Sequence, residues 1–309
     1  MFLLWGIIVS FLSGATSMSF AAAPEQFRVE NKTGLFRQFY LYSSTPHPRG
    51  LVIMLHGCKT NAAEFDQGTE MSKYGAKYNL AVLYPEQSIY DNIDKCWNWF
   101  WGTENEIIAE GIRLVQNRFG LNRKNTFLMG MSAGAAQGAI MANLHRDLFS
   151  AALLHSGLQY LAATNLNDAQ ASLEHGSFTP YRQAARIGLE NNRSQAPIQF
   201  MVVYGDQDKR VDPKNSIENA NELLELNRLI YLRNNATPMI NITKGTSPAQ
   251  GMKLGFYESY LTINNTFIGS VIQVNGLVHE WSGGNPVQPR NNPNGPKVVD
   301  RFFNLLGIF

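Results

Sequence analysis

Charged residues are scarce in this chain of 309 residues: Asp, Glu, Lys and Arg make up 16% of it, and the formal net charge is +2. No run of Lys or Arg could follow a phosphate backbone, so nucleic acid is not expected as a partner. Beyond the N-terminus no stretch of about eighteen residues is apolar, so no stable membrane span is predicted there. No repeat or linker divides the chain, which predicts one domain over residues 22–309. The oligomeric state is not indicated.

Spacings typical of metal sites are also missing. The only cysteines are Cys58 and Cys96, and the six histidines include no His-x-His or His-Glu-x-x-His pair. We therefore expect no bound metal, and the chemistry inferred below requires no cofactor.

The N-terminus has the features of a secretory signal over residues 1–21. An apolar segment, MFLLWGIIVSFLSGA, precedes small residues, and Ser19 and Ala21 fit the positions required for cleavage after Ala21. No Lys or Arg precedes the apolar segment, so a membrane anchor or a wrongly assigned start of the chain is the alternative. A signal of this kind predicts that the protein is secreted or periplasmic. In such an oxidising compartment the isolated pair Cys58 and Cys96 is expected to be bridged.

Short apolar segments alternate with helical patterns along the chain, which predicts a mostly parallel sheet covered by helices on both faces. An edge strand is expected at 36–44 and an irregular insertion at 160–194. The predicted buried strands are 51–55, 80–87, 125–130, 149–157, 196–205 and 269–276, and the predicted helices are 61–79, 105–120, 133–145, 215–232 and a closing helix within 298–309.

The sequence FLMGMSAGAA contains a G-x-S-x-G pentapeptide centred on Ser132, between an apolar strand and a helix. In that context the glycines permit a tight, strained turn that exposes the serine hydroxyl at the carboxyl edge of the sheet. A serine that merely caps the helix is the alternative, but a cap leaves the flanking glycines unexplained. We therefore predict that Ser132 is a nucleophile.

A serine nucleophile needs a base and an acid, which follow it in the order Ser, Asp or Glu, His in this fold class. His279 is the one histidine beyond the strand that should precede the acid. The segment GDQDKRVDP offers three carboxylates for the acid. Asp208 is preferred, Asp206 is the second candidate, and Asp212 before Pro213 has the pattern of a turn or helix cap.

The stretch LVIMLHGCKT leaves four roles open for Cys58: nucleophile, metal ligand, half of a disulfide, or none. Once Ser132 is assigned, the strand-end His-Gly sequence fits the loop that supplies one oxyanion amide, from Cys58, while Ala133 supplies the other. A bridge to Cys96 would then tie this loop down, at a chain-entropy gain of roughly 3–4 kcal/mol. His56 is expected to support the loop from inside.

The motifs LHGC, YPEQ, CWNWF, GMSAGA and HEWSGG occur in the order and spacing of polyhydroxybutyrate depolymerase-type esterases. This family of secreted α/β-hydrolases includes feruloyl- and acetylxylan-esterase-like members. The resemblance implies a triad of Ser132, Asp208 and His279, with Cys58 and Ala133 at the oxyanion hole. Ala135 replaces a frequent third glycine.

Many such depolymerases carry a linker and a polymer-binding domain after the catalytic one, and we expect neither here. The expected substrates are therefore hydroxybutyrate oligomers and related short hydroxyalkanoates, amorphous polymer or small esters, with feruloyl or acetylxylan esters as the alternative. Trp97, Trp99 and Trp281 are candidates for the walls of an apolar cleft. A non-catalytic binding protein on a hydrolase scaffold and a peptidase are the competing hypotheses.

Overall fold

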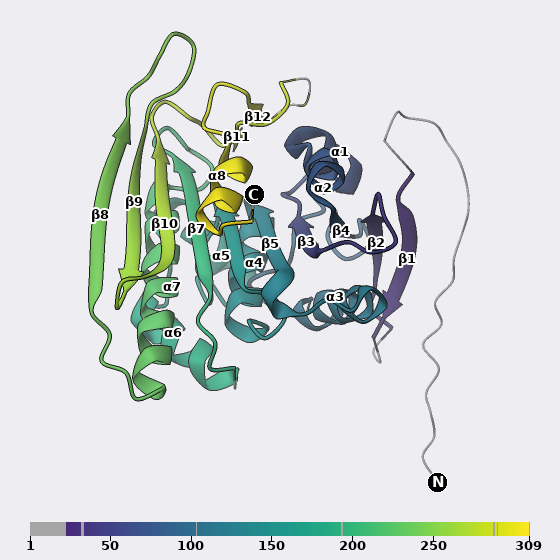
Figure 1. The fold of residues 1–309 in the computed structure, drawn as a ribbon, viewed down its shortest axis with the longest axis horizontal. Coiled ribbons are helices and arrows are strands. Elements are labelled where there is room, and N and C mark those ends of the chain that lie inside the picture. The colour runs from purple at the N-terminus through teal and green to yellow at the C-terminus, as the bar shows by residue number, and fades with distance from the viewer. Residues whose placement is uncertain are drawn as a thin grey trace.

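A ten-stranded sheet forms the centre of the computed structural model (Figure 1), in the order β1-β2-β4-β3-β5-β6-β7-β10-β9-β8. The structure describes residues 23–31, 34–102, 104–192, 194–286, 288 and 290–308, so the predicted signal lies outside the described residues. The strands are β1 Glu25–Glu30, β2 Phe36–Tyr42, β3 Gly50–Leu55, β4 Leu80–Glu86, β5 Thr126–Met131, β6 Ala151–His155, β7 Gln199–Gly205, β8 Ile240–Ser247, β9 Phe256–Ile263 and β10 Thr266–Val274.

The middle of the sheet is parallel and its two sides are antiparallel. Strands β4, β3, β5, β6, β7 and β10 pair in parallel. Strands β1 and β2 continue the sheet antiparallel on one side, and β9 and β8 do so on the other. The predicted α/β class with a mostly parallel sheet is confirmed.

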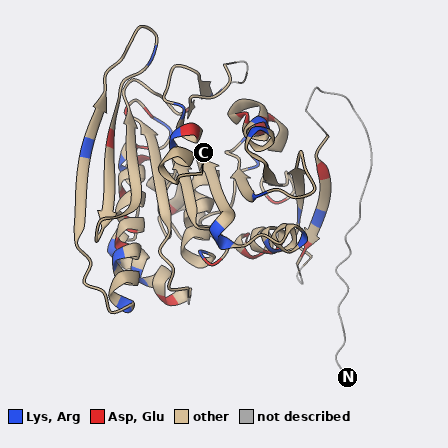
Figure 2. Ribbon diagram, viewed as in Figure 1, with Lys and Arg blue, Asp and Glu red and all other residues tan. Residues whose placement is uncertain are grey.

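The parallel strands are buried on both faces, as their unbroken apolar sequences predict. In β3, Leu51, Ile53 and Leu55 join one hydrophobic core, whereas Val52 and Met54 join the core on the opposite face. Side chains alternate between the two faces of a strand, so one short segment contributes to both cores. Figure 2 shows that the middle of the sheet is nearly free of charged residues.

Helices cover both faces of the sheet. The core on one side contains residues of α3 (Asn105–Phe119), α4 (Ala133–Leu144), α6 (Tyr181–Asn191) and α7 (Pro213–Arg233). The other contains residues of α1 (Ala62–Thr69), α2 (Met71–Tyr78) and α8 (Val298–Leu305). The remaining elements are α5 (Leu166–His175), the 3-10 turn Arg123–Asn125 and the two-residue strands β11 (Trp281–Ser282) and β12 (Asn291–Asn292).

Four details differ from the sequence-based expectations. β1 lies outside β2, so the strand predicted at the edge is internal. The helix predicted over 61–79 is divided at Glu70, whose φ of 56° ends α1. The segment 160–194, expected to be irregular, contains α5 and α6. Strands β8 and β9 were not predicted, because their mixed, partly exposed sequences lack a continuous apolar run.

Among the described residues, no helix combines the length and the apolar character that crossing a membrane would require.

Packing between α8 and β5 supports the strand that leads to Ser132. The Phe303 ring is fully buried, with its centroid 5.8 Å from that of Phe127. We predict that Phe303→Ala lowers the free energy of unfolding by about 3–5 kcal/mol, because it removes buried apolar atoms and leaves a cavity. Urea unfolding measures the change. Phe178→Ala, at a ring that is 57% exposed, is the matched control and should change stability little; equal effects would contradict the prediction.

Candidate active site

Ser132 lies at a strained turn between β5 and α4. Its φ of 57° and ψ of −124° are unusual for a residue with a side chain, a conformation that costs about 1–3 kcal/mol. A Cβ at Gly130 would collide with the carbonyl of Gly134, and a Cβ at Gly134 would collide with the carbonyl of Leu55. The two glycines therefore allow strand, turn and helix to approach this closely.

The Ser132 side chain does not cap α4, although Ser132 occupies the N-cap position. Its Oγ instead lies 2.9 Å from Nε2 of His279. The backbone of Ser132 is held separately, since its amide donates to the carbonyl of His155 at 2.9 Å and its carbonyl accepts from the amide of Ala136 at 3.0 Å. The alternative of a simple helix cap is therefore wrong.

His279 connects Ser132 to Asp208. Nδ1 of His279 lies 2.7 Å from Oδ2 of Asp208, and this carboxylate is almost fully buried. Because a carboxylate only accepts hydrogen bonds, Nδ1 carries the proton and Nε2 is free to accept the proton of Ser132. The three residues, which lie 147 and 71 positions apart along the chain, form one continuous hydrogen-bonded series.

The second oxygen of Asp208 is also fixed. Its Oδ1 accepts hydrogen bonds from the amides of Arg210 at 2.9 Å and Val211 at 3.0 Å. Burial by itself raises the pKa of Asp208, but the hydrogen bond and charge of His279, together with these two amides, outweigh that effect and leave the pKa below its ordinary value. The carboxylate is thus ionised and oriented toward His279.

The other two carboxylates of this loop have different partners. Oδ1 of Asp206 accepts from the amide of Gly276 at 2.7 Å. Asp212 caps α7, with its side chain accepting from the amide of Lys214 at 2.8 Å. Of the three candidates, only Asp208 contacts His279, and the predicted capping role of Asp212 is confirmed.

The loop after β3 lies against the turn at Ser132. A Cβ built on Gly57 would be 3.4 Å from Cβ of Ser132. Among the described residues, no acceptor engages the backbone amides of Cys58 and Ala133. These are the two amides that the sequence assigned to an oxyanion hole, and both are available to an external acceptor.

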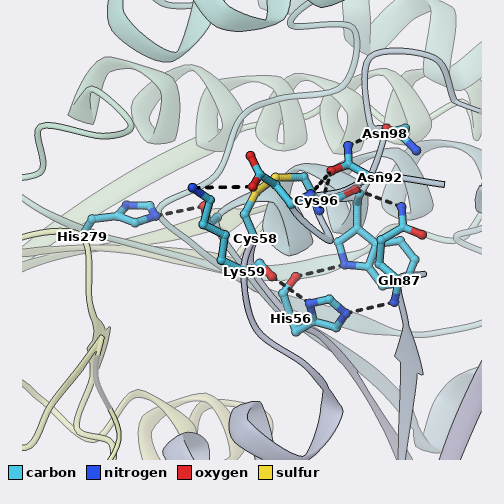
Figure 3. Close-up of a disulfide and its surroundings, with 12 residues drawn as sticks. His56, Cys58, Lys59, Gln87, Asn92, Cys96, Asn98 and His279 are labelled. Carbon is cyan, nitrogen blue, oxygen red and sulfur yellow. Dashed lines mark hydrogen bonds and ion pairs between the residues drawn. A yellow bond between two sulfur atoms is a disulfide. The ribbon is translucent and has the colours of Figure 1, made fainter. Parts of the chain in front are cut away.

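Cys58 and Cys96 form a disulfide, with a Cα–Cα distance of 4.2 Å and a sequence separation of 38 (Figure 3). The predicted bridge is therefore confirmed, and a bridged sulfur is neither a free nucleophile nor a metal ligand. Figure 3 also shows the imidazole of His279 pointing toward the loop that carries Cys58. The bridge fixes this loop to the segment that contains Cys96.

His56 supports the same loop from inside. Its Nδ1 donates to the carbonyl of Gly57 at 2.7 Å, and its Nε2 accepts from the amide of Gln87 at 3.1 Å. Complete burial lowers the pKa of His56 to about 4, so the ring is neutral. A neutral imidazole can donate through one nitrogen and accept through the other. The indole of Trp97 donates to the carbonyl of His56 at 3.0 Å.

A buried carboxylate, Glu104, anchors the segment on the far side of the bridge. It accepts from the guanidinium of Arg37, from the side chain of Gln87 at 2.5 Å, and from the amide of Asn98 at 2.8 Å. This anchor was not predicted from the sequence. The clue in the sequence was Arg37, which occupies an inward position of the alternating strand β2. A charge at such a position requires a buried partner.

The expectation that Trp97 and Trp281 line a cleft is wrong. Their side chains are 0% and 1% exposed, so they pack in the protein interior. Trp281 stacks on His155, with ring centroids 5.3 Å apart. Trp99 is half-buried and packs against Phe100.

A buried histidine, His155, steadies the segment that follows His279. Its Nε2 accepts from the amide of Ser282 at 3.2 Å, and its Nδ1 lies 3.1 Å from Oγ of Ser156. Burial, reinforced by the nearby charge of His279, lowers the pKa of His155 to about 3. His155 is therefore a neutral structural residue.

The fold is that of an α/β-hydrolase, and Ser132 lies at the strand–helix turn at which this fold class carries its nucleophile. Among solved structures, acetyl xylan esterase from Aspergillus awamori superposes with a TM-score of 0.65 over 88% of this chain and 94% of its own, at 17% sequence identity. That likeness supports the fold.

The family model described as Esterase PHB depolymerase matches residues 38–237. The chain belongs to this family of carboxylic ester hydrolases, and the resemblance inferred from its motifs is confirmed.

Two relatives illustrate the range of the family. Poly(3-hydroxyalkanoate) depolymerase C of Paucimonas lemoignei is 26% identical over 86% of this chain and 66% of its own length. Acetylxylan esterase A of Talaromyces purpureogenus is 25% identical over 61% of this chain and 53% of its own. The chain thus spans about half to two thirds of these relatives.

The two buried histidines predict a loss of stability in acid. An unfolded histidine titrates near pH 6.5, about three units above His155 and His56 in the folded chain, so the unfolded chain binds more protons at intermediate pH. The free energy of unfolding should fall by about 2 kcal/mol per histidine from about pH 7 to about pH 5, and fall further until the folded pKa is reached. Urea unfolding at a series of pH values between about 7 and 5 measures this fall in the free energy of unfolding.

His155→Gln keeps an acceptor for Ser282 and should remove the share of the slope that His155 contributes. An unaltered slope in His155→Gln would contradict the assignment.

Loss of the disulfide should loosen the loop of Cys58. We predict that Cys96→Ser lowers the free energy of unfolding by about 3–4 kcal/mol, because the unfolded chain regains the freedom that the bridge removes. Denaturant unfolding of the variant and of the oxidised and reduced native protein measures the effect. The reduced native protein should match the variant; a variant as stable as the oxidised protein would refute the estimate.

Proposed function

We propose that this chain is a serine carboxylesterase that works through an acyl-enzyme. The supporting observation is the unbroken series Asp208–His279–Ser132 beside two unengaged amides. Oγ of Ser132 attacks the ester carbonyl carbon while Nε2 of His279 takes the hydroxyl proton. The amides of Cys58 and Ala133 donate to the negatively charged oxygen of the tetrahedral intermediate, and each such donor typically contributes about 3–4 kcal/mol to transition-state stabilisation.

Collapse of the intermediate breaks the bond to the alcohol oxygen, and His279 returns its proton to the departing alcohol. A water molecule then attacks the acyl-enzyme, with His279 as its base. The second intermediate collapses to release the acid and restore Ser132. Asp208 keeps the imidazole in the required tautomer and stabilises its positive charge.

The favoured substrates in this proposal are hydroxybutyrate and other short hydroxyalkanoate oligomers. Membership of the family and the match to a poly(3-hydroxyalkanoate) depolymerase support this choice. Acetylated or feruloylated carbohydrate is the second candidate, because several relatives are named acetylxylan esterases. Trp99, half-buried, is the tryptophan of the three that remains a candidate for the cleft wall.

We also propose that residues 22–309 act as one catalytic domain outside the cytoplasm, either secreted or periplasmic. The continuous ten-stranded central sheet supports one domain. The disulfide supports an oxidising compartment.

Substitution of Ser132 and of Asp208 tests the mechanism. Ser132→Ala should lower kcat for p-nitrophenyl butyrate by about 10⁴–10⁶ and abolish labelling by a fluorophosphonate. Asp208→Asn should lower kcat by about 10⁴, because the amide imposes the wrong tautomer on His279.

Asp206→Asn is the matched control, since an asparagine oxygen can still accept from Gly276, and its kcat should change little. Equal losses in the Asp206 and Asp208 variants would reject Asp208 as the acid, and wild-type hydrolysis by Ser132→Ala would reject the mechanism.

A further inference from the structure

A groove of about 530 Å³ opens directly beside His279. One wall comes from the loop that carries Asp208, and the other from the loops around His279 and Arg290. Its lining residues are Gln207, Lys209, Arg210, Gly276, Val278, His279, Glu280 and Arg290. The proposed base therefore forms part of the surface of this groove.

The charge of the groove is strongly one-sided. Lys209, Arg210 and Arg290 line it, against the single carboxylate of Glu280. None of the three cations forms an ion pair with any residue that the structure describes, and Glu280 accepts instead from the side chain of Asn292 at 2.9 Å. Two further carboxylates of the same loop, Asp206 and Asp208, are engaged by the amide of Gly276 and by His279. The three cations, which have no ion-pair partner among the described residues, therefore favour a negatively charged ligand in the groove.

Two of these cations are held by the catalytic loops themselves. The amide of Arg210 donates to Asp208, which fixes its backbone. The guanidinium of Arg290 donates to the carbonyl of Cys58 at 2.5 Å, and its own carbonyl accepts from the amide of Trp281 at 2.7 Å. Arg290 thus lies between the oxyanion loop and the groove. Toward the residues that the structure describes, the guanidinium uses one of its five donors, and the others can engage a ligand.

We infer that this groove binds a carboxylate of the substrate, so that the enzyme prefers esters that carry a free acid group near the bond to be broken. This inference rests on the proposed esterase function. A guanidinium presents donors in a fork that matches a carboxylate, and Lys209 and Arg210 add charge around it. The acid end of a short hydroxyalkanoate oligomer has this chemistry, as does the carboxylate of an acidic sugar.

The test compares two substrates that differ only in charge. The linear dimer of 3-hydroxybutyrate is prepared as the free acid and as its terminal carboxamide, and kcat/KM for cleavage of the internal ester is measured for each. The native enzyme should prefer the free acid about tenfold, since a charged hydrogen bond in an exposed groove gives a moderate gain. The preference for the free acid should come from a lower KM with little change in kcat, and it should decrease with added salt.

The variants assign that preference to the groove. Lys209→Gln combined with Arg210→Gln, and separately Arg290→Gln, should lower kcat/KM for the free acid about tenfold more than for the carboxamide, whereas Arg290→Lys should retain part of the preference. Lys244→Gln removes an equal charge from exposed β8, outside the groove, and should leave both rates unchanged.

The outcomes separate the two proposals. Equal kcat/KM for acid and carboxamide overturns the groove assignment while leaving the esterase intact. Variants that lose both activities in equal proportion also overturn it, because the cations would then only support the loops. Hydrolysis of p-nitrophenyl butyrate through Ser132 without cleavage of either dimer also overturns the groove assignment. Absence of Ser132-dependent hydrolysis of both dimers and of p-nitrophenyl butyrate overturns the esterase proposal itself. The same comparison with acetylated glucuronic acid and acetylated glucose shows which source of carboxylate is preferred.

Discussion

Ser132 can keep a φ of 57° only because the strand before it and the helix after it are fixed on all sides. Strand β5 lies between β3 and β6, and α4 is buried from Ala133 to Asn143. Gly134 allows α4 to approach the end of β3 so closely that no side chain fits between them. That approach also brings the loop of Gly57 and Cys58 beside the hydroxyl. The serine and both candidate oxyanion amides are therefore positioned by one packing contact.

The loop after β3, which carries Cys58, is held by two physically different devices. A covalent one, the disulfide, limits how far Cys58 can move from Cys96. A polar one combines the neutral ring of His56 with the buried carboxylate of Glu104 and its charged partner Arg37. Removing one member of such a buried set leaves a charge or donor unsatisfied, so the segment is fixed as a unit. An amide that must donate to a short-lived anion benefits from that rigidity, because no reorganisation is then needed during the reaction.

Sequence reasoning recovered the parts of the molecule that local patterns control. The parallel strands were recognisable as unbroken apolar runs, and the turn at Ser132 from its glycines and its place between strand and helix. The sequence was less informative about which side chains contact one another in the folded protein. Asp206 and Asp208 have the same chemistry two positions apart, and a hydrogen bond that spans 71 residues selects one of them. Trp97 and Trp281 were misassigned because an aromatic residue near an active site has the same sequence signature whether it faces solvent or the interior. Strands β8 and β9 were missed because exposed antiparallel strands carry no apolar run.

The bridge has a consequence for how the two halves of the site respond to a reductant. One covalent bond joins Cys58, in the loop beside Ser132, to a residue 38 positions away. Once that bond is cut, the loop is held by non-covalent contacts alone, among them the hydrogen bond from His56 to Gly57. The series Ser132–His279–Asp208 contains no sulfur, so a reductant acts directly on the loop of Cys58 and not on the three side chains.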